Sequence, residues 1–184
     1  EWAVFFSSGY NNEVSGSSGD GFLFALNPQT GVLKTGYPIA TGATTLSSNL
    51  GKIAVWADNP STDNTAQYVY AGDLNGDLWR FDLDHTNTAA GHTNTQVFKL
   101  AHLEVGTVAQ PITTKPELTA TEAGTRIVFV GTGKYLETTD LTNTATQGFY
   151  AIKDTLGAPN LGGGSQATWN PLADTTSINV LGVP

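Results

Sequence analysis

The sequence of 184 residues contains no cysteine and no methionine, and only 13% of its residues are charged. The lack of cysteine excludes a disulfide framework and a thiolate metal site. The net charge of −8 argues against binding to nucleic acid or to an anionic membrane surface, because both require clustered Lys and Arg. No apolar run is long enough to span a bilayer. A signal peptide is also missing, since residues 2–6 already form a strand-like run, so we expect a fragment of a longer protein whose targeting segment lies outside it.

The residue types that are abundant in the chain are typical of β-sheet proteins. Thr, Tyr, Trp, Phe and Val suit pleated surfaces, and the 21 Gly together with many Asn and Asp residues suit tight turns. No stretch shows sustained helical periodicity. The composition therefore predicts an all-β fold.

Residues 68–83, YVYAGDLNGDLWRFDL, contain the clearest local signal. Asn75-Gly76 separates two β-favouring runs, which predicts a hairpin with a type I′ turn and a positive φ at Gly76. In this interpretation Asp73, Asn75 and Asp77 stabilise the turn. The alternative is a calcium loop beginning Asp-x-Asn-x-Asp, although its glycine comes at position four and not at position six.

The alternation of residues after this turn predicts which side of the strand faces the protein interior. Period two places Trp79, Phe81 and Leu83 on one face of the strand and Arg80 between them on the other. Because the first set is apolar and aromatic, we expect the odd-numbered face to be the more buried.

Three similar units follow one another along the chain. Each has an apolar strand that ends at a glycine, and these glycines, Gly9, Gly72 and Gly131, are 63 and 59 residues apart. Repeats of this size built from short antiparallel strands are typical of propeller blades. We therefore expect a single domain over residues 1–184, with approximate repeats at 2–50, 51–108 and 109–156 and a loop-like tail at 157–184. Since a closed ring needs at least about four blades, about three repeats predict a partial β-propeller, made of four-stranded sheets packed face to face.

Two other patterns were weighed as possible ligand sites. The run GTGK at residues 131–134 follows a strand, but it lacks both the glycine spacing of a phosphate loop and a following helix, so we interpret it as a strand-end turn. The three histidines, His85, His92 and His102, have no metal-binding spacing, and we expect solvated loop residues.

Five stretches, taken in order, resemble the C-terminal β-propeller region of the PilY1/PilC family, large proteins associated with bacterial type IV pili. They are WAVFFSSGYNN and GFLFALNPQTG near the start, YVYAGDLNGDLWRFDL, AQPITTKPEL at residues 109–118, and VFVGTGKYLETTDLTNTATQGFYAIKD at residues 128–154. The resemblance implies an exported protein at the outer membrane, the cell surface or the pilus tip. It also implies pilus or pilus-assembly proteins, and the rest of the parent chain, as partners.

The same resemblance implies a calcium loop just before the Tyr68 strand, where family members carry Asp-x-Asp-x-Asn/Asp-Gly-x-x-Asp. The ligand positions of that pattern fall on Asn59, Ser61, Asp63 and Gln67, and Asp58 lies just outside them. Only Asp63 is a carboxylate in register, and Asn64 replaces the turn glycine. Because calcium affinity depends on the number of charged ligands, we expect either no cofactor or weakly bound Ca²⁺.

The function that follows from the resemblance is that of a non-enzymatic module, which supports pilus biogenesis, opposes retraction and aids surface adhesion. Two alternatives come from other classes. Residues 22–31 also resemble a strand of quinoprotein propellers, which would make the chain part of a pyrroloquinoline-quinone enzyme. A carbohydrate-binding propeller is the third possibility.

Overall fold

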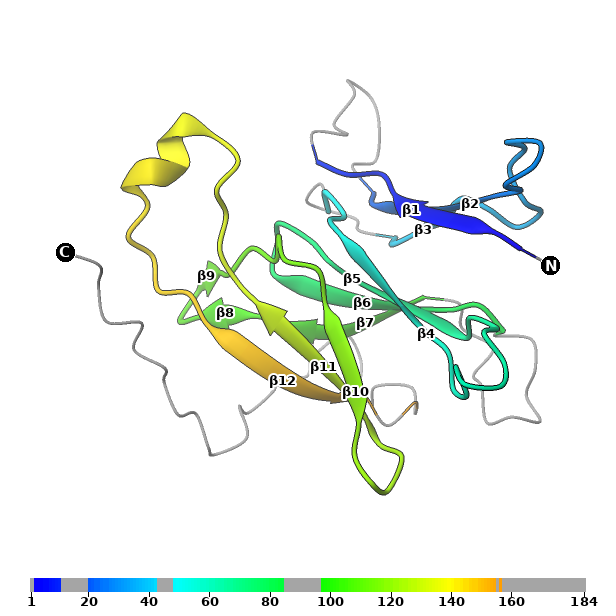
Figure 1. Cartoon of the computed structure of the whole chain (residues 1–184). Coiled ribbons are helices and arrows are strands. Elements are labelled where there is room, and N and C mark those ends of the chain that lie inside the picture. Colours follow the sequence, from blue (N-terminus) through cyan, green and yellow to red (C-terminus); the bar gives the residue numbers. More distant parts are fainter. Residues whose placement is uncertain (1, 11–19, 43–47, 85–96, 155, 157–184) are drawn as a thin grey trace.

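The computed structural model describes residues 2–10, 20–42, 48–84, 97–154 and 156, and it contains three antiparallel sheets that follow one another in sequence (Figure 1). The first sheet consists of β1 (Val4–Ser7), β2 (Phe22–Leu26) and β3 (Ile39–Ala40). The central sheet consists of β4 (Ile53–Trp56), β5 (Tyr68–Gly72), β6 (Asp77–Asp82) and β7 (Val97–His102). The last sheet consists of β10 (Glu117–Ala120), β11 (Arg126–Gly131) and β12 (Phe149–Asp154). A ribbon of β8 (Glu104–Val105) and β9 (Val108–Ala109) connects the last two sheets.

The all-β prediction is confirmed, since the helical element of the described residues is one short 3-10 turn, η2 (Thr138–Thr142). Only the central sheet has the expected four strands, whereas the other two have three each among the residues that the structure describes. The open stack of sheets is consistent with the predicted partial propeller. The division into a single domain stays a prediction, and the predicted tail at residues 157–184 lies outside the described part of the chain.

The central sheet lies between the other two, and each of its faces contributes to a separate hydrophobic core. Val69 and Phe81 pack with Leu23 and Ile39 of the first sheet. Tyr70 and Leu78, from the opposite face, pack with a second group of side chains. That group includes Val128, Val130 and Ile152 of the last sheet. Every residue of β5 and β6 is consequently buried.

The prediction that the odd-numbered face of β6 is the more buried is wrong. Trp79 and Phe81 are buried as expected, with 5% and 0% of their surface exposed, but Arg80 on the other face is only 1% exposed. Alternation distinguishes the two faces of a strand, but it does not reveal that a further sheet covers the second face. The register also shifts between Leu78 and Trp79, where a β-bulge lies in the pairing of β6 with β7.

The outward faces of the two terminal sheets remain partly exposed. On the first sheet the rings of Phe6 and Phe24 stack with their centroids 5.0 Å apart, and Val4 beside them is 49% exposed. On the last sheet Phe149 stacks on Phe129 and is 68% exposed. The stack thus ends in apolar surface on both sides of the described structure.

The hairpin between β5 and β6 is present, but its turn is not type I′. Gly76 has the predicted positive φ of 79°, whereas Asn75 is not among the described residues with positive φ. The N–H of Gly76 donates to Asp73 O and the N–H of Asp73 donates to Asp77 O, at 3.3 and 3.0 Å. These bonds enclose a three-residue loop, which is a type I turn followed by a left-handed glycine.

The side chain of Asp73 explains this turn geometry. Its Oδ1 accepts hydrogen bonds from the N–H groups of Asn75 and Asp77, both at 2.9 Å. Its Oδ2 accepts the indole N–H of Trp79 at 2.8 Å. The loop therefore wraps around a buried carboxylate, and local Asn-Gly preference alone does not set the turn type.

We expect Gly76→Ala to destabilise the protein by about 3 kcal/mol, because a left-handed residue with a side chain is strained and the new Cβ would also lie only 2.4 Å from the Leu103 carbonyl oxygen. The matched control is Gly106→Ala, at a φ of 66° with nothing within 4 Å of the new Cβ, which should cost about 1 kcal/mol. Urea unfolding of both variants tests this difference. Equal losses would contradict it.

Candidate functional site

The loop predicted as a calcium site connects β4 to β5 and forms a tight turn of its own. The N–H groups of Thr62 and Asp63 both donate to the Asn59 carbonyl oxygen, at 2.9 and 2.7 Å. The structure therefore brings the predicted residues Asp58, Asn59, Ser61, Asp63 and Gln67 into one exposed segment, except that Gln67 is half-buried.

Two of the oxygen atoms that calcium would need accept hydrogen bonds from protein groups. Asp63 Oδ1 accepts the hydroxyl of Thr65 at 2.6 Å and its backbone N–H at 2.9 Å, and these two bonds lower the pKa of Asp63. The side-chain oxygen of Gln67 accepts the backbone N–H of Asp58 at 2.8 Å.

Asp58 pairs with a cation of the protein itself. Its Oδ1 accepts the indole N–H of Trp56 at 2.7 Å and forms a close ion pair with the guanidinium of Arg126 on β11. The guanidinium carbon of Arg126 also lies 4.7 Å from the ring centroid of Tyr68. The loop is thus fastened to the last sheet by positive charge, which does not fit a bound Ca²⁺ at Asp58. Within the described part of the chain, no group of three or more His, Asp or Glu side chains is arranged to hold a metal ion.

The buried contact between the central and last sheets is one that sequence reasoning missed. Arg80 Nη1 lies 2.5 Å from Asp154 Oδ1, and each side chain is 1% exposed. The hydroxyl of Tyr70 donates to Asp154 Oδ2 at 2.7 Å. Burial, followed by the nearby Asp154 carboxylate, raises the pKa of Tyr70, so this phenol remains a donor.

Two aromatic rings complete the environment of Arg80. Its guanidinium carbon lies 4.4 Å from the ring centroid of Phe98 and 5.8 Å from that of Tyr68. The sequence did contain a signal for this contact. Arg80 lies between apolar residues of a strand, and a buried guanidinium needs a carboxylate partner. That partner comes from the end of β12, 74 residues away, which strand alternation does not identify.

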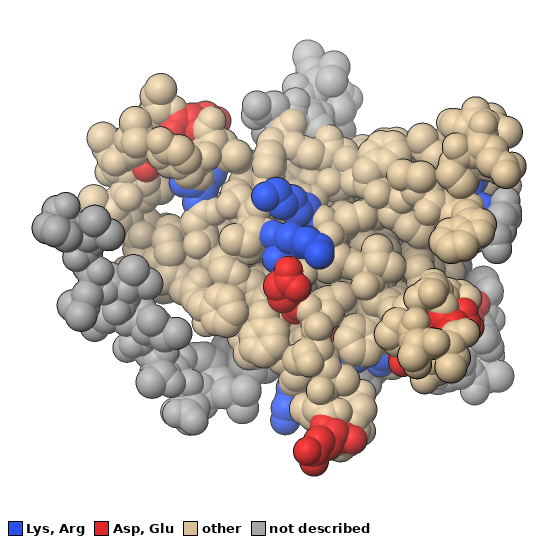
Figure 2. All heavy atoms as spheres, in the orientation of Figure 1, with Lys and Arg blue, Asp and Glu red and all other residues tan. Residues whose placement is uncertain are grey.

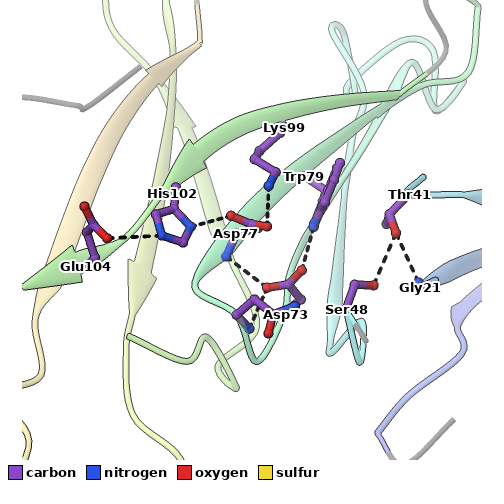
Figure 3. A network of polar contacts seen from close by, with 10 residues as sticks. Gly21, Thr41, Ser48, Asp73, Asp77, Trp79, Lys99, His102 and Glu104 are labelled. Atoms are coloured by element: carbon purple, nitrogen blue, oxygen red, sulfur yellow. Dashed lines mark hydrogen bonds and ion pairs between the residues drawn. The ribbon is translucent and has the colours of Figure 1, made fainter. Parts of the chain in front are cut away.

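A third polar cluster lies at the turn end of the central sheet (Figure 3). Asp77 Oδ2 pairs with Lys99 Nζ and Asp77 Oδ1 with His102 Nδ1, both at 2.6 Å. His102 Nε2 lies 3.5 Å from Glu104 Oε2. The Lys99 cation at Asp77, and the three N–H donors on Asp73, do not fit the alternative calcium loop at Asp73, Asn75 and Asp77.

Two further predictions from the sequence concern the three histidines and the GTGK run at residues 131–134. The expectation of a solvated loop is wrong for His102, which ends β7 and is paired on both ring nitrogens, whereas His85 and His92 lie outside the described residues. Thr132 and Gly133 donate their backbone N–H groups to Gly148 and Pro111, so these groups are not available to cradle a phosphate.

The surface shows no feature of a nucleic-acid site on the face drawn in Figure 2, where uncharged residues predominate and the few basic groups lie near acidic ones. Among the described residues, no helix has the length and apolar character needed to cross a membrane. Ion pairs connect the last sheet to the central sheet and to the loop between β4 and β5.

We expect Asp154→Ala to destabilise the protein by about 4 kcal/mol, because it leaves the Arg80 guanidinium buried without a counter-charge. Asp58→Ala, at a pair in which the carboxylate side chain is 40% exposed, is the matched control and should cost about 1 kcal/mol or less. Adding Arg80→Met to Asp154→Ala should restore part of the loss, since no buried charge remains. Urea unfolding measures all three, and a double variant less stable than Asp154→Ala would refute the explanation.

We expect calorimetry with Ca²⁺ to detect no binding at micromolar concentrations, because the loop at residues 58–67 offers one exposed, in-register carboxylate, and both that carboxylate and the Gln67 side-chain oxygen already accept hydrogen bonds from the protein. Asp63→Ala should leave the titration unchanged. A micromolar dissociation constant that disappears in Asp63→Ala would show that the loop rearranges to bind calcium.

Comparison with known proteins shows which family the chain resembles. A family model described as the PilY1 beta-propeller domain matches residues 1–168. The type IV pilus biogenesis factor PilY1 of Pseudomonas aeruginosa strain PAO1 is 31% identical over 159 residues, which cover 76% of this chain and 13% of that protein. A homolog of that factor in Xylella fastidiosa is 30% identical over 158 residues, which cover 83% of this chain and 11% of that protein.

A solved structure agrees with the sequence relatives. The crystal structure of the Pseudomonas aeruginosa PilY1 C-terminal domain superimposes with a TM-score of 0.66 at 28% identity, and the match covers 86% of this chain and 35% of that one. The chain thus spans only a small part of its curated relatives. Because the family match includes all three sheets, the chain belongs to the PilY1 β-propeller domain family.

Proposed function

We propose that this chain is a non-enzymatic structural module of a type IV pilus biogenesis factor, which supports pilus assembly, opposes retraction and aids surface adhesion. The observation that carries the proposal is the family match over residues 1–168, since the curated relatives are named as type IV pilus biogenesis factors. Their names describe no enzymatic activity.

The contacts between the sheets support a structural role. The Arg80–Asp154 pair and the Arg126–Asp58 pair connect separate sheets at points far apart in sequence. Directional contacts of this kind oppose sliding between apolar faces, which is useful in a protein that transmits or resists a pulling force.

The proposal also covers the cellular location, the partners and the cofactors of the protein. The protein is exported and works at the outer membrane, the cell surface or the pilus tip, and its partners are pilus or pilus-assembly proteins and other parts of the parent polypeptide. It uses no cofactor, apart from Ca²⁺ bound weakly at most. Since the chain covers 13% of the Pseudomonas protein, these roles belong to the whole parent protein.

Counting surface pili tests the proposal. We expect deletion of the parent gene to remove pili, and complementation with the full-length gene to restore them, whereas a gene lacking the codons for residues 1–168 should not. If the module opposes retraction, pili should return in the deletion strain when the retraction motor is also inactivated. Normal piliation of the strain that lacks residues 1–168 would contradict the proposal.

An absorbance measurement separates this proposal from the quinoprotein alternative. Purified parent protein is incubated with pyrroloquinoline quinone and Ca²⁺ and then desalted. We expect no retained quinone absorbance, and stoichiometric retention would favour the enzyme.

A further inference from the structure

The connection between β11 and β12 is much longer than the equivalent connection in the central sheet. Residues 73–76 join β5 to β6, whereas residues 132–148 join β11 to β12 and include η2. We call this segment the β11–β12 loop, and Figure 1 shows that it projects beyond the ends of the strands. Long loops on a compact sheet domain are uncommon and often carry a function.

The base of the β11–β12 loop is fixed to its surroundings by hydrogen bonds. The N–H of Thr132 donates to Gly148 O at 2.8 Å, and the N–H of Gly148 donates to Thr132 Oγ1 at 2.7 Å. Gln110 is buried beside the returning strand, where its Nε2 donates to Thr146 O at 2.8 Å. Its Oε1 accepts the hydroxyl of Tyr150. The loop therefore leaves the sheet in a defined direction.

One carboxylate organises the tip of the loop, which comprises residues 135–141. Asp140 Oδ2 accepts the backbone N–H of Leu136 at 2.8 Å and that of Glu137 at 2.9 Å. Asp140 Oδ1 lies 3.2 Å from Lys134 Nζ, and the Asp140 side chain is only 4% exposed. Because these donors hold the tip in one conformation, little conformational entropy is lost when another molecule binds to it.

Three apolar side chains on this ordered tip are exposed. Tyr135 is 75% exposed, Leu141 65% and Leu136 46%. The hydrogen bonds to Asp140 fix the backbone beside Leu136, so these side chains do not fold back onto the sheet. A tyrosine and two leucines presented by a preorganised loop are typical of a surface that binds protein.

The position of the tip distinguishes it from the faces on which sheets pack. The central sheet packs on its two neighbours through its faces. A further sheet on the same stack would cover Phe129 and Phe149, on the outward face of the last sheet. The tip lies past the strand ends instead, at the turn end of the β11–β12 hairpin (Figure 1). Extension of the stack therefore leaves the tip exposed.

The charges of the loop indicate which kind of surface fits it. Its charged residues are Lys134, Glu137 and Asp140. Lys134 and Asp140 neutralise each other, whereas Glu137 is exposed beside Leu136. A complementary partner offers an apolar pocket with Lys or Arg at its edge. The net charge of −8 favours approach of such a partner and opposes approach to an anionic membrane.

We propose that the tip at residues 135–141 is a docking surface for a separate protein that has an apolar pocket with a basic rim. This inference rests on the function proposed above, and it names the surface through which the module contacts a pilus or pilus-assembly protein. Tyr135 and Leu141 enter the pocket and Glu137 faces its rim. Asp140 is a positioning residue, because it acts through the conformation of the tip.

Counting surface pili on strains that produce full-length variants of the parent protein tests the surface. We expect Tyr135→Ser and Leu141→Ser each to reduce piliation about tenfold, since each removes an apolar side chain from the centre of the contact. Glu137→Lys should reduce it more than Glu137→Gln, because the new charge repels a basic rim. Val32→Ser, at a side chain that is 63% exposed between β2 and β3, is the matched control and should leave piliation normal.

Amide hydrogen exchange on the purified parent protein tests the role of Asp140 without a partner. Asp140→Ala keeps Tyr135 and Leu141 but removes the acceptor that holds the tip. We expect exchange at Leu136 and Glu137 to become about tenfold faster or more, and piliation to fall as in Tyr135→Ser. Unchanged exchange, or normal piliation with fast exchange, would refute the positioning role and with it the preorganised surface.

Chemical modification of tyrosine, read by mass spectrometry, shows what covers the tip. Tyr135 should be modified in the purified full-length parent protein and protected in piliated cells. Protection in the purified protein would mean that another part of the same polypeptide covers the tip. A dimer of the purified protein that Tyr135→Ser dissociates would mean that a second copy does. Each of these results, and equal modification in both samples, would overturn the proposal.

Two failures are distinguishable by stability and by deletion. Tyr135→Ser and Leu141→Ser should unfold in urea like the wild type, because both side chains are exposed. If a gene lacking the codons for residues 1–168 supports normal piliation, the proposed function itself fails. If that deletion abolishes pili while Tyr135→Ser and Leu141→Ser leave them normal, the docking surface is refuted and the proposed function stands.

Discussion

The rest of the structure depends on the burial of the central sheet on both faces. If only one face of the sheet were buried, Arg80 could lie in solvent. Both faces of β6 are buried, so the guanidinium needs an anionic partner inside the protein. Asp154 on β12 provides it, and Tyr70 satisfies the second carboxylate oxygen. The packing of the last sheet on this face therefore brings a carboxylate to the buried guanidinium.

The two interfaces of the central sheet use different chemistry as a result. Toward the first sheet the contacts are apolar, with Leu23, Ile39 and Phe81 among the buried side chains. Toward the last sheet an apolar core is accompanied by the Arg80–Asp154 and Arg126–Asp58 pairs. Dispersion and hydrophobic burial do not depend strongly on direction, whereas ion pairs and hydrogen bonds do. The ion pairs at the second interface therefore add directional contacts to its apolar core.

The loop before β5 is held by contacts with other groups of the protein. The resemblance to PilY1 implies acidic ligands for calcium in this loop, and here a protein cation, Arg126, balances Asp58 while Thr65 satisfies Asp63. With Arg126 the restraint comes from a neighbouring sheet, so the loop contributes to the contact between sheets as well as to its own shape.

The sequence by itself determined the all-β class, the three successive strand units, the hairpin at residues 68–83 and the positive φ of Gly76, because these features depend on local preference and on period two. Only the tertiary structure decided the turn type around Asp73, the burial of Arg80, and the pairing of His102 with Asp77 and Glu104. Each of these depends on groups brought together from different strands. Alternation along one strand reports which residues share a face, but it contains no information about what covers that face.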